Sequence, residues 1–400
     1  MHLTHLSLTN YRAFSRLDTD LPRRILLLVG DNAQGKTSLL EAVYFLATFA
    51  SFQAQNDRQL VNFLVSKEPL AVARLVADYH RSNKNHRLEV RLIQESAGNG
   101  NLRLRKEILL DGVKRGVHEA MGHFTAVIFL PQMIRILENG PDERRRYLNL
   151  ALSQAVPGYS QALSDYNQAL SQRNALLKQL AERGGDQEQL AYWDGIISQR
   201  GAEIIHARIA AILELEKQAA RIHHKLTHSK EVLRLDYQPC YDPLPAPRGQ
   251  YALPIQTTVL RDGFSRDQIQ AGFAQKLLAL RSEDITRGVT TCGPHRDELR
   301  FLGNGIDLGD YGSRGQARTA LLSLKLAEVN WLKERTGQWP VLLLDEILVE
   351  LDNQRRADLL KYLVDYEQAL LTTTDLKLFS PEFVETAAVW KVENGKISSD

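Results

Sequence analysis

The chain has 400 residues, more than the usual domain of about 100–150 residues, so we expect a compound domain or two domains. Its composition, 44% hydrophobic and 24% charged, excludes a disordered or collagen-like protein. The formal net charge is only +2, so any contact with nucleic acid must come from a local patch. Two cysteines cannot form a disulfide framework, and we recognise neither an export signal nor an apolar run of membrane-spanning length. These features predict a cytoplasmic protein without membrane contact.

The N-terminal part is predicted to consist of short strands and one helix. Residues 25–29 form a continuous apolar run, which is typical of a strand buried on both faces. A polar loop follows, and then a helix over 38–50. Residues 71–116 alternate between apolar and polar positions and contain the turn Asp111-Gly112. Because Asp-Gly between strands is a strong hairpin signal, this part predicts an antiparallel meander.

The composition changes after Pro141 to segments rich in Gln, Ala, Leu, Glu and Arg. Apolar residues keep a 4-3 spacing over 159–180 and again over 190–204, which predicts two antiparallel helices that meet at residues 183–186. Arg173 interrupts the spacing in the first helix. This part is therefore predicted to be a short helical lobe.

The last third of the chain is predicted to return to mixed structure. A helix over 266–283 leads into strands at 287–292 and 298–308. Helices and strands then alternate, which is the pattern of an α/β sheet. The expected segments are a helix at 317–336, a strand at 340–344, a helix at 354–363 and a strand at 368–373.

Residues 30–37, Gly-Asp-Asn-Ala-Gln-Gly-Lys-Thr, match the phosphate-binding pattern G-x-x-x-x-G-K-T/S. Glycines let backbone amides face phosphate oxygens, Lys36 adds a full positive charge, and the Thr37 hydroxyl can hold Mg2+. An ordinary glycine-rich turn is the alternative, but the position between a buried strand and a helix favours a nucleotide site. The predicted ATP-binding residues are Gly30, Asp31, Asn32, Ala33, Gln34, Gly35, Lys36, Thr37 and Ser38.

A second motif, Asp345-Glu346, follows the apolar strand at 340–344. Asp345 at the carboxyl end of that strand is suited to hold Mg2+, and Glu346 to polarise an attacking water. Buried strands often end in acidic residues, but a phosphate loop in the same chain favours the functional interpretation. We therefore predict Glu346 and Lys36 as catalytic residues, and Thr37 and Asp345 as metal ligands.

A third motif distinguishes this chain from kinases and GTPases. Ser313, Arg314, Gly315 and Gln316 open an apolar helix, and such a signature caps the γ-phosphate of the opposite subunit in ATP-binding cassette enzymes. The alternative is a simple N-cap by Ser313. Glu350 and Asp352 stand at the spacing of a D-loop, and residues 372–375 at that of a switch segment. These spacings favour the cassette interpretation.

The predicted fold class is α/β, an ABC-type P-loop ATPase head with a mixed sheet, an antiparallel meander and an inserted helical lobe. We predict three parts. Residues 1–150 form the N-terminal part of the head, 151–284 the helical lobe, and 285–400 the C-terminal part of the head.

These motifs resemble the RecF family of bacterial recombinational-repair ATPases, which is related to SMC-type heads. The resemblance also rests on the opening strand with Asn10-Tyr11-Arg12, on residues 129–131, 140–148 and 172–174, and on Gly-Pro-His-Arg-Asp at 293–297. It extends from residue 3 to about 375. This chain departs from the family pattern at Ala33, Ser38, Gln53, Glu346 and Val349, where Gly, Asn, Arg, Asp and Ser are usual.

The resemblance implies an ATP-dependent homodimer that hydrolyses ATP slowly, binds double-stranded or gapped DNA, and assists RecA loading together with RecO and RecR in repair and replication. It also implies that Arg12 belongs to the ATP-binding residues. Cofactors would be ATP and Mg2+.

Two questions stay open at the level of sequence. The basic clusters at 103–106, 114–115 and 144–146 could neutralise DNA phosphates, or they could pair with neighbouring acidic residues such as Glu107, Asp142 and Glu143. The alternative functions are an ABC-type ATPase of a transport or translation system and a metabolite kinase. A single cassette without a membrane segment counts against the first, and the signature and D-loop count against the second.

Overall fold

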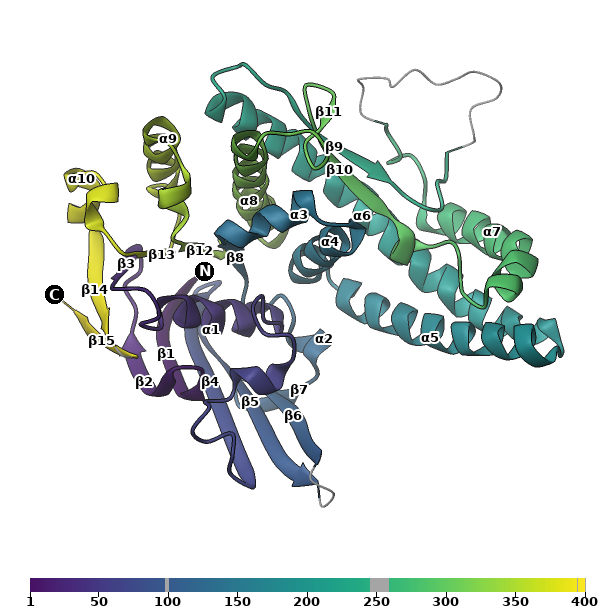
Figure 1. Cartoon of the computed structure of the whole chain (residues 1–400), viewed down its shortest axis with the longest axis horizontal. Helices are drawn as coiled ribbons and strands as arrows, with labels where there is room; N and C mark the ends of the chain where they lie inside the picture. The colour runs from purple at the N-terminus through teal and green to yellow at the C-terminus, as the bar shows by residue number, and fades with distance from the viewer. Residues whose placement is uncertain (98–100, 245–258, 394, 400) are drawn as a thin grey trace. The chain divides into compact units, whose positions relative to one another are not determined.

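The computed structural model describes residues 1–97, 101–244, 259–393 and 395–399 (Figure 1). The chain divides into two compact units. The first unit comprises Met1–Met133 and Glu328–Asp400, and the second comprises Ile134–Ala327. This division follows spatial contacts, whereas the boundaries expected at 150 and 284 follow changes in composition. Among the described residues, no helix combines the length and the apolar character needed to cross a membrane.

The first unit contains an antiparallel sheet with the strand order β2-β1-β4-β5-β6-β7. Two-residue turns join β4 to β5 and β6 to β7, and Asp111 and Gly112 both have positive φ in the second of these turns. The meander predicted over 71–116 is therefore confirmed. The strands are β1 (His2–Tyr11), β2 (Phe14–Asp20), β4 (Leu70–Arg81), β5 (Lys84–Ala97), β6 (Asn101–Leu110) and β7 (Val113–Arg115).

A second sheet of the first unit has the order β15-β14-β3-β13-β12-β8. Neighbouring strands from β14 to β8 are parallel, and only β15 is antiparallel to its neighbour. The predicted strands at 25–29, 340–344 and 368–373 are confirmed. The strands are β3 (Ile25–Val29), β8 (Ala126–Phe129), β12 (Val341–Asp345), β13 (Ala369–Thr373), β14 (Ala387–Glu393) and β15 (Lys396–Ser399).

Helix α1 (Lys36–Thr48) shares one hydrophobic core with both sheets. Leu39, Leu40 and Phe45 of this helix are fully buried, together with Leu6 of β1 and Leu28 of β3. Because α1 is covered on several sides, the loop before it is held by a rigid framework. The remaining helical segments of this unit are η1 (Asp57–Leu60), α2 (Val117–Ala120), η2 (Pro131–Ile134, which crosses the unit boundary), η5 (Ile347–Glu350), α9 (Asn353–Leu363), η6 (Leu376–Leu378) and α10 (Pro381–Glu385).

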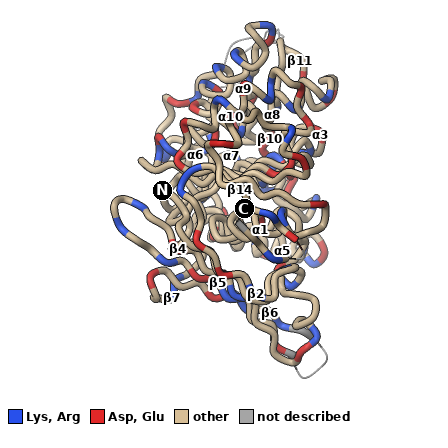
Figure 2. Tube along the Cα trace, turned by 90° about the vertical axis from the view of Figure 1, so that its left-hand side faces the viewer, with Lys and Arg blue, Asp and Glu red and all other residues tan. Residues whose placement is uncertain are grey.

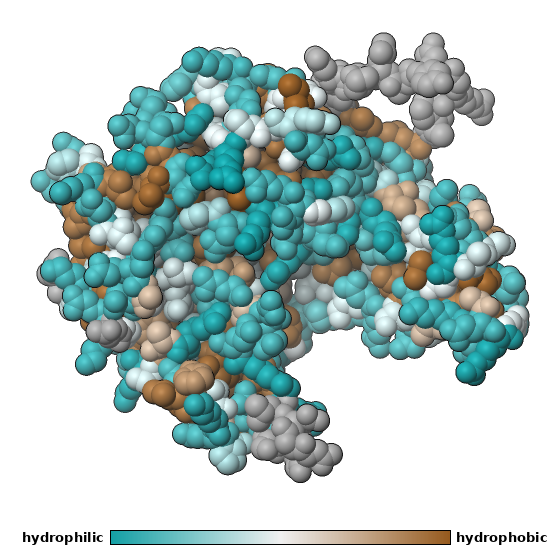
Figure 3. All heavy atoms as spheres, viewed as in Figure 1, coloured by the Kyte–Doolittle hydropathy of each residue, from teal (hydrophilic) through white to brown (hydrophobic). Residues whose placement is uncertain are grey.

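A shallow groove lies between α9 and α10, and its lining includes Leu360, Val364, Phe379 and Phe383. This part of the surface shows as an apolar patch on the left of Figure 3.

The second unit is mainly helical. Helix α5 (Tyr159–Arg183) ends before Gly184, and α6 (Leu190–Leu226) follows after a 3-10 turn, η3 (Gln187–Gln189), so the predicted helix pair and its break are confirmed. Helix α8 (Arg314–Thr336) begins in this unit and ends in the first. The other elements are α3 (Arg135–Glu138), α4 (Pro141–Ala155), α7 (Arg266–Arg287), η4 (Pro294–Arg296), β9 (Leu233–Gln238), β10 (Glu298–Gly303) and β11 (Ile306–Asp307).

The predicted strand at 287–292 is wrong. Helix α7 continues to Arg287 and ends at Gly288, which has a φ of 64°. The backbone amides beyond it bind side chains instead of a neighbouring strand. Thr290 N–H donates to Asn174 Oδ1 (2.8 Å), and Thr291 N–H donates to Asp284 Oδ1 (2.9 Å). These polar anchors satisfy the segment without a sheet ladder.

Arg173, which interrupts the apolar spacing of α5, forms the centre of a buried ion network. Its side chain is 0% exposed. Its guanidinium donates to Asp194 of α6 (2.7 Å), to Asp284 of α7 (2.7 Å) and to Thr290 (2.9 Å). The Arg173 guanidinium therefore links α5, α6 and α7. The residue that interrupts the apolar spacing of α5 makes a polar contact in the core of the unit.

Candidate nucleotide site

The loop between β3 and α1 has a backbone that requires glycine at two positions. Gly35 precedes α1 with a φ of 107°, a conformation that L side chains rarely adopt. At Gly30 an added Cβ atom would lie 2.3 Å from the carbonyl oxygen of Val392. Ala33 also has a positive φ, 66°, although it carries a side chain. The loop is therefore held in the shape that exposes backbone amides.

A pocket of about 310 Å³ lies over this loop. Most of the predicted loop residues line it, and so do both acidic residues at the end of β12. Gly30, Asp31 and Arg12 are not among the described residues that line it. The lining consists of Ala13, Asn32, Ala33, Gln34, Gly35, Lys36, Thr37, Ser38, Pro131, Gln132, Asp345 and Glu346.

The ammonium group of Lys36 is held inside the loop. Its side chain is only 4% exposed. Nζ donates to the carbonyl oxygens of Gly30 (2.6 Å) and Asp31 (2.9 Å), and it lies 3.1 Å from Glu346 Oε1. The cation is thus fixed next to the pocket, with Glu346 as its counter-charge.

Thr37 and Asp345 meet at the base of the pocket. The Thr37 hydroxyl donates to the Asp345 carboxylate at 3.0 and 2.9 Å, and the Thr372 hydroxyl donates to the same carboxylate at 2.7 Å. Asp345 is 6% exposed. Burial raises the pKa of this carboxyl above its usual value, against the lowering effect of the two hydroxyl groups. A cation at this position would relieve that cost.

The donor set fits Mg2+. A threonine hydroxyl and a carboxylate are hard oxygen ligands, and Mg2+ in phosphate sites is usually bound by few protein ligands together with water and phosphate.

Glu346 has an unusual backbone conformation for a side chain of its size. Its φ is 49° and its ψ is 22°, which is the left-handed region. Its N–H donates to Thr372 Oγ1 at 3.0 Å, so Thr372 holds both Asp345 and the peptide of Glu346. Such strain is found where a side chain is held in a functional position.

Sequence reasoning assigned Thr372 only to a switch segment and missed this contact. The contact could have been predicted from the pairing of the two strands that carry Asp345 and Thr372. β13 pairs with β12 in parallel, and Thr372 lies opposite Asp345.

Arg12 is placed differently from the other predicted ATP-binding residues. Its guanidinium forms a two-pronged ion pair with the buried carboxylate of Glu41, at 2.7 and 2.8 Å, and also donates to the carbonyl of Gln59. The pair supports the packing of α1 below the loop. A direct role of Arg12 in ATP binding stays a prediction.

The predicted signature residues, 313–316, lie in the second unit, at the start of α8. Ser313 Oγ accepts the N–H of Gln316 (3.2 Å), and Gln316 Oε1 accepts the N–H of Ser313 (3.0 Å). This is a capping box. Ser313 and Arg314 are exposed, while Gly315 and Gln316 are half-buried. Ser313 therefore caps helix α8. That residues 313–316 also bind the γ-phosphate of ATP stays a prediction.

The two residues predicted to form a D-loop, Glu350 and Asp352, lie at and just after the end of η5. Asp352 caps α9, where its carboxylate accepts the N–H of Arg355 at 2.9 Å. Glu350 is the last residue of η5. The capping contact of Asp352 does not test the predicted role of Glu350 and Asp352 at a dimer interface, which stays a prediction.

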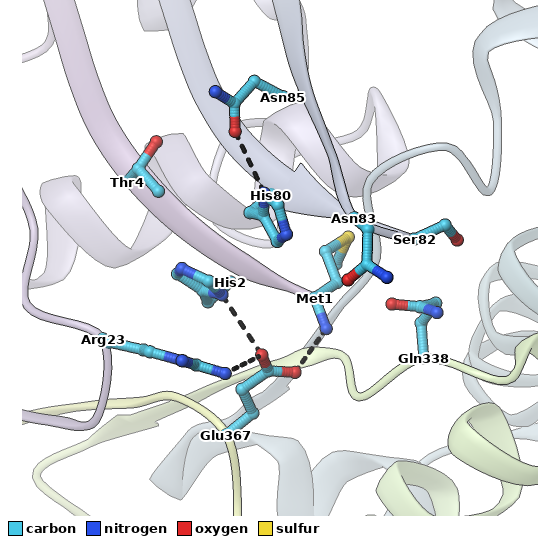
Figure 4. A pocket seen from close by; sticks show the side chains of 10 residues that line it. All are labelled: Met1, His2, Thr4, Arg23, His80, Ser82, Asn83, Asn85, Gln338 and Glu367. Atoms are coloured by element: carbon cyan, nitrogen blue, oxygen red, sulfur yellow. Dashed lines mark hydrogen bonds and ion pairs between the residues drawn. The ribbon is translucent and has the colours of Figure 1, made fainter.

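A separate pocket of about 640 Å³ lies at the edge of the same unit (Figure 4). Glu367 is its central charge. Its carboxylate contacts the amino group of Met1, His2 Nδ1 (3.1 Å) and Arg23 (3.3 Å). Burial lowers the pKa of His2. The charges that the described residues bring to this pocket pair with one another around Glu367.

The basic clusters are extensively paired with acidic residues, which interleave with them along β5, β6 and β7 in Figure 2. Arg105 and Lys114 both contact Glu107 at 2.9 Å. In the other cluster, Arg144 forms an ion pair with Glu298 (2.7 Å), and Arg145 pairs with Asp142. These contacts favour structural ion pairs for the residues involved.

The fold and the site together define a class of protein, the P-loop ATPase head. Residues 2–398 match the family model described as the RecF/RecN/SMC N terminal domain. The chain is 37% identical over 408 residues to the DNA replication and repair protein RecF of Chloroflexus aggregans, with 99% of each chain covered. It is 34% identical to the protein of that name from Lacticaseibacillus paracasei, with both chains covered completely.

Solved structures agree with these relatives. Two are described as the recombination mediator protein RecF-ATPrS and RecF-ATP in the RecFOR pathway. Both have a TM-score of 0.82 and 29% identity; they cover all of this chain and 98% and 97% of theirs. The chain belongs to the RecF/RecN/SMC family. The family, the ATPase-head fold and the assignment to DNA replication and repair that the sequence predicted are therefore confirmed.

Proposed function

We propose that this protein is an ATP-dependent DNA-binding protein of recombinational repair and replication. In this proposal it binds ATP with Mg2+ at the loop of residues 30–37, hydrolyses ATP slowly and dimerises when ATP is bound. The observation that carries the proposal is the Thr37–Asp345 contact, which joins two motifs that are 308 residues apart in the chain. The solved relatives described with ATP support the choice of nucleotide.

The geometry suggests how each residue acts. Loop amides and Lys36 would bind the β- and γ-phosphates. Thr37 and Asp345 would hold Mg2+, which neutralises phosphate charge. Lys36 lies 3.1 Å from Glu346, so an incoming phosphate would compete with this carboxylate for the ammonium group. Once displaced from Lys36, Glu346 is free to accept a proton from the attacking water.

The dimer is proposed because residues 313–316 open helix α8 as a signature does, and in ATP-binding cassette enzymes such a signature caps the γ-phosphate of the opposite subunit. Helix α8 is 23 residues long, and its first N–H groups carry partial positive charge. In a dimer, residues 313–316 of one subunit would complete the site of the other. Glu350 and Asp352 would lie at the same interface.

The test is ATP-dependent association measured by equilibrium sedimentation, each protein with ATP and with ADP. Wild type should associate more tightly with ATP. Glu346→Gln should bind ATP and stay dimeric, because the lost carboxylate serves hydrolysis. Ser313→Arg should bind ATP but neither dimerise nor hydrolyse it.

Ser265→Arg is a matched control, since Ser265 and Gln268 form the same type of capping box at α7. If Ser313→Arg and Ser265→Arg both dimerise like wild type, Ser313 is only a helix cap and the proposed dimer site is wrong.

DNA, RecO, RecR and RecA are proposed partners. The description of similar structures as members of a RecFOR pathway supports RecO and RecR. ATP hydrolysis should rise with duplex or gapped DNA. The alternative, an ATPase of a transport or translation system, predicts a rate independent of DNA.

A further inference from the structure

The chain has only two cysteines, and the fold of the second unit brings them together. Cys240 follows β9, and Cys292 precedes the turn that leads into β10. These strands are antiparallel, with Gln238 opposite Glu298, so the segments beyond this end of the ladder run side by side. The two sulfur atoms lie 2.9 Å apart. A disulfide needs about 2.05 Å, so an approach of about 0.9 Å would join them.

Buried polar contacts hold Cys240 in this place. Its N–H donates to Asp297 Oδ1 at 2.9 Å. Asp297 is 1% exposed, and its other oxygen accepts hydrogen bonds from Arg208 (2.6 Å) and Tyr237 (2.5 Å). The position of Cys240 is therefore fixed by the core of the unit and does not depend on a free loop.

The two thiols have different environments. Cys240 is exposed, whereas Cys292 is 2% exposed. The hydrogen bond between the two thiols lowers the pKa of Cys240 to about 7, and the same contact together with burial raises the pKa of Cys292. Lys276 and the backbone of Gly293 also stabilise the Cys240 thiolate, against the opposing charge of Asp297. An exposed thiolate beside a buried thiol is the arrangement of an attacking and a resolving cysteine.

We propose that Cys240 and Cys292 form a reversible oxidation site whose substrate is a hydroperoxide. The Cys240 thiolate attacks the outer peroxide oxygen, the O–O bond breaks, and the alcohol or water leaves as the reduced product. Cys240 is then a sulfenic acid. Cys292 gives up its proton and attacks this sulfur, the S–O bond breaks, and water leaves with formation of the disulfide. A dithiol restores both thiols by exchange.

The product would link the end of β9 to the segment 288–297, which also contains Thr290, Thr291 and His295. That segment is held to α7 and α5 by the hydrogen bonds of Thr290 and Thr291. Oxidation would therefore fix the turn between α7 and β10.

The experiment uses the full reduced chain, exposed to hydrogen peroxide at a small molar excess and then alkylated with iodoacetamide for mass spectrometry. We expect a monomer without alkyl groups, lighter than the reduced chain by two hydrogen atoms, and full alkylation after dithiothreitol. Cys240→Ser should leave Cys292 reduced. Cys292→Ser should stop at a sulfenic acid that dimedone traps on Cys240.

A second measurement follows the alkylation rate of Cys240 against pH. Its midpoint should be about 7 in the wild type and should move upward in Cys292→Ala, because the hydrogen bond is lost. The proposal is overturned if peroxide leaves both wild-type thiols open to alkylation, if the disulfide joins two chains, or if Cys292→Ala leaves the midpoint unchanged. Any of these results would mean that the two cysteines are only neighbours in the fold and do not form a peroxide-sensitive pair.

Discussion

The contact between Thr37 and Asp345 can be tested by removing one hydroxyl group. In Thr37→Val the shape of the side chain is kept, but the buried carboxylate loses one of its two hydroxyl donors. Hydrogen bonds to charged groups contribute about 1.5–3 kcal/mol net, so the free energy of unfolding should fall by about that amount. The loss raises the pKa of Asp345 further. The difference from wild type should therefore be largest at pH values where the carboxylate is ionised, and it should shrink as pH falls and the group is protonated.

Thr372→Val is the control, because it removes the other hydroxyl from the same carboxylate. Without ligand it should lose more stability than Thr37→Val, because the Thr372 hydroxyl also accepts the N–H of Glu346. The two variants should also differ with ATP and Mg2+, since only Thr37 is a proposed metal ligand. At 100 times the Kd, ligand adds about 2.7 kcal/mol to the wild type, and Thr372→Val should keep most of this gain. Thr37→Val should lose most of it.

The assay is urea unfolding followed by circular dichroism, with and without ATP and Mg2+. Equal ligand-induced gains in all three proteins would refute the metal role of Thr37. Unchanged unfolding in both variants without ligand would refute the reasoning about the buried carboxylate.

Three further predictions concern charged groups. Lys36→Ala should raise the Kd for ATP by about 10- to 150-fold, the equivalent of about 1.5–3 kcal/mol, and calorimetric titration with unchanged affinity would contradict it. Burial lowers the pKa of His295 to about 4, so between pH 6.5 and 4 the unfolded chain is protonated at this residue while the folded chain is not. The free energy of unfolding should therefore fall by up to about 3 kcal/mol as the pH falls through this window. In urea unfolding, the His295→Gln variant should lose less stability over the same window. Arg173→Met leaves Asp194 and Asp284 without their shared cation and should cost about 3–5 kcal/mol in urea unfolding, and a loss below 1 kcal/mol would count against the network.

The parts of the site that the sequence predicted are those with local signals. The loop of residues 30–37 requires glycine for its backbone, and the strands beside it are short apolar runs, so spacing alone locates both motifs. The helix pair of the second unit was equally visible, because the Gly-Gly break falls between α5 and α6.

The contacts that sequence reasoning missed depend on partners distant in the chain. Arg173 was visible only as an interruption, since its partners stand 21 and 111 positions away. The link between Thr372 and Asp345 needs the register of β12 and β13. The segment 287–292 has strand-like composition, but its amides bind Asn174 and Asp284, and no periodic pattern encodes this.

Ala33 departs from the family pattern at a position where the backbone conformation disfavours a side chain. Gly is usual at this position, and Ala33 has a φ of 66°, a conformation that costs an L residue about 1–2 kcal/mol. Glycine removes that cost, but it also gives the unfolded chain more conformational entropy, which lowers stability by about 0.4–1 kcal/mol. On balance, Ala33→Gly should raise the free energy of unfolding by about 1 kcal/mol. Ala357→Gly is the control, because Ala357 is exposed within α9 and should lose about 1 kcal/mol on the same change. Opposite signs in urea unfolding would trace the effect to the backbone of the loop. If Ala33→Gly loses stability as Ala357→Gly does, the positive φ carries no strain, and alanine fits the loop of residues 30–37 as well as glycine would.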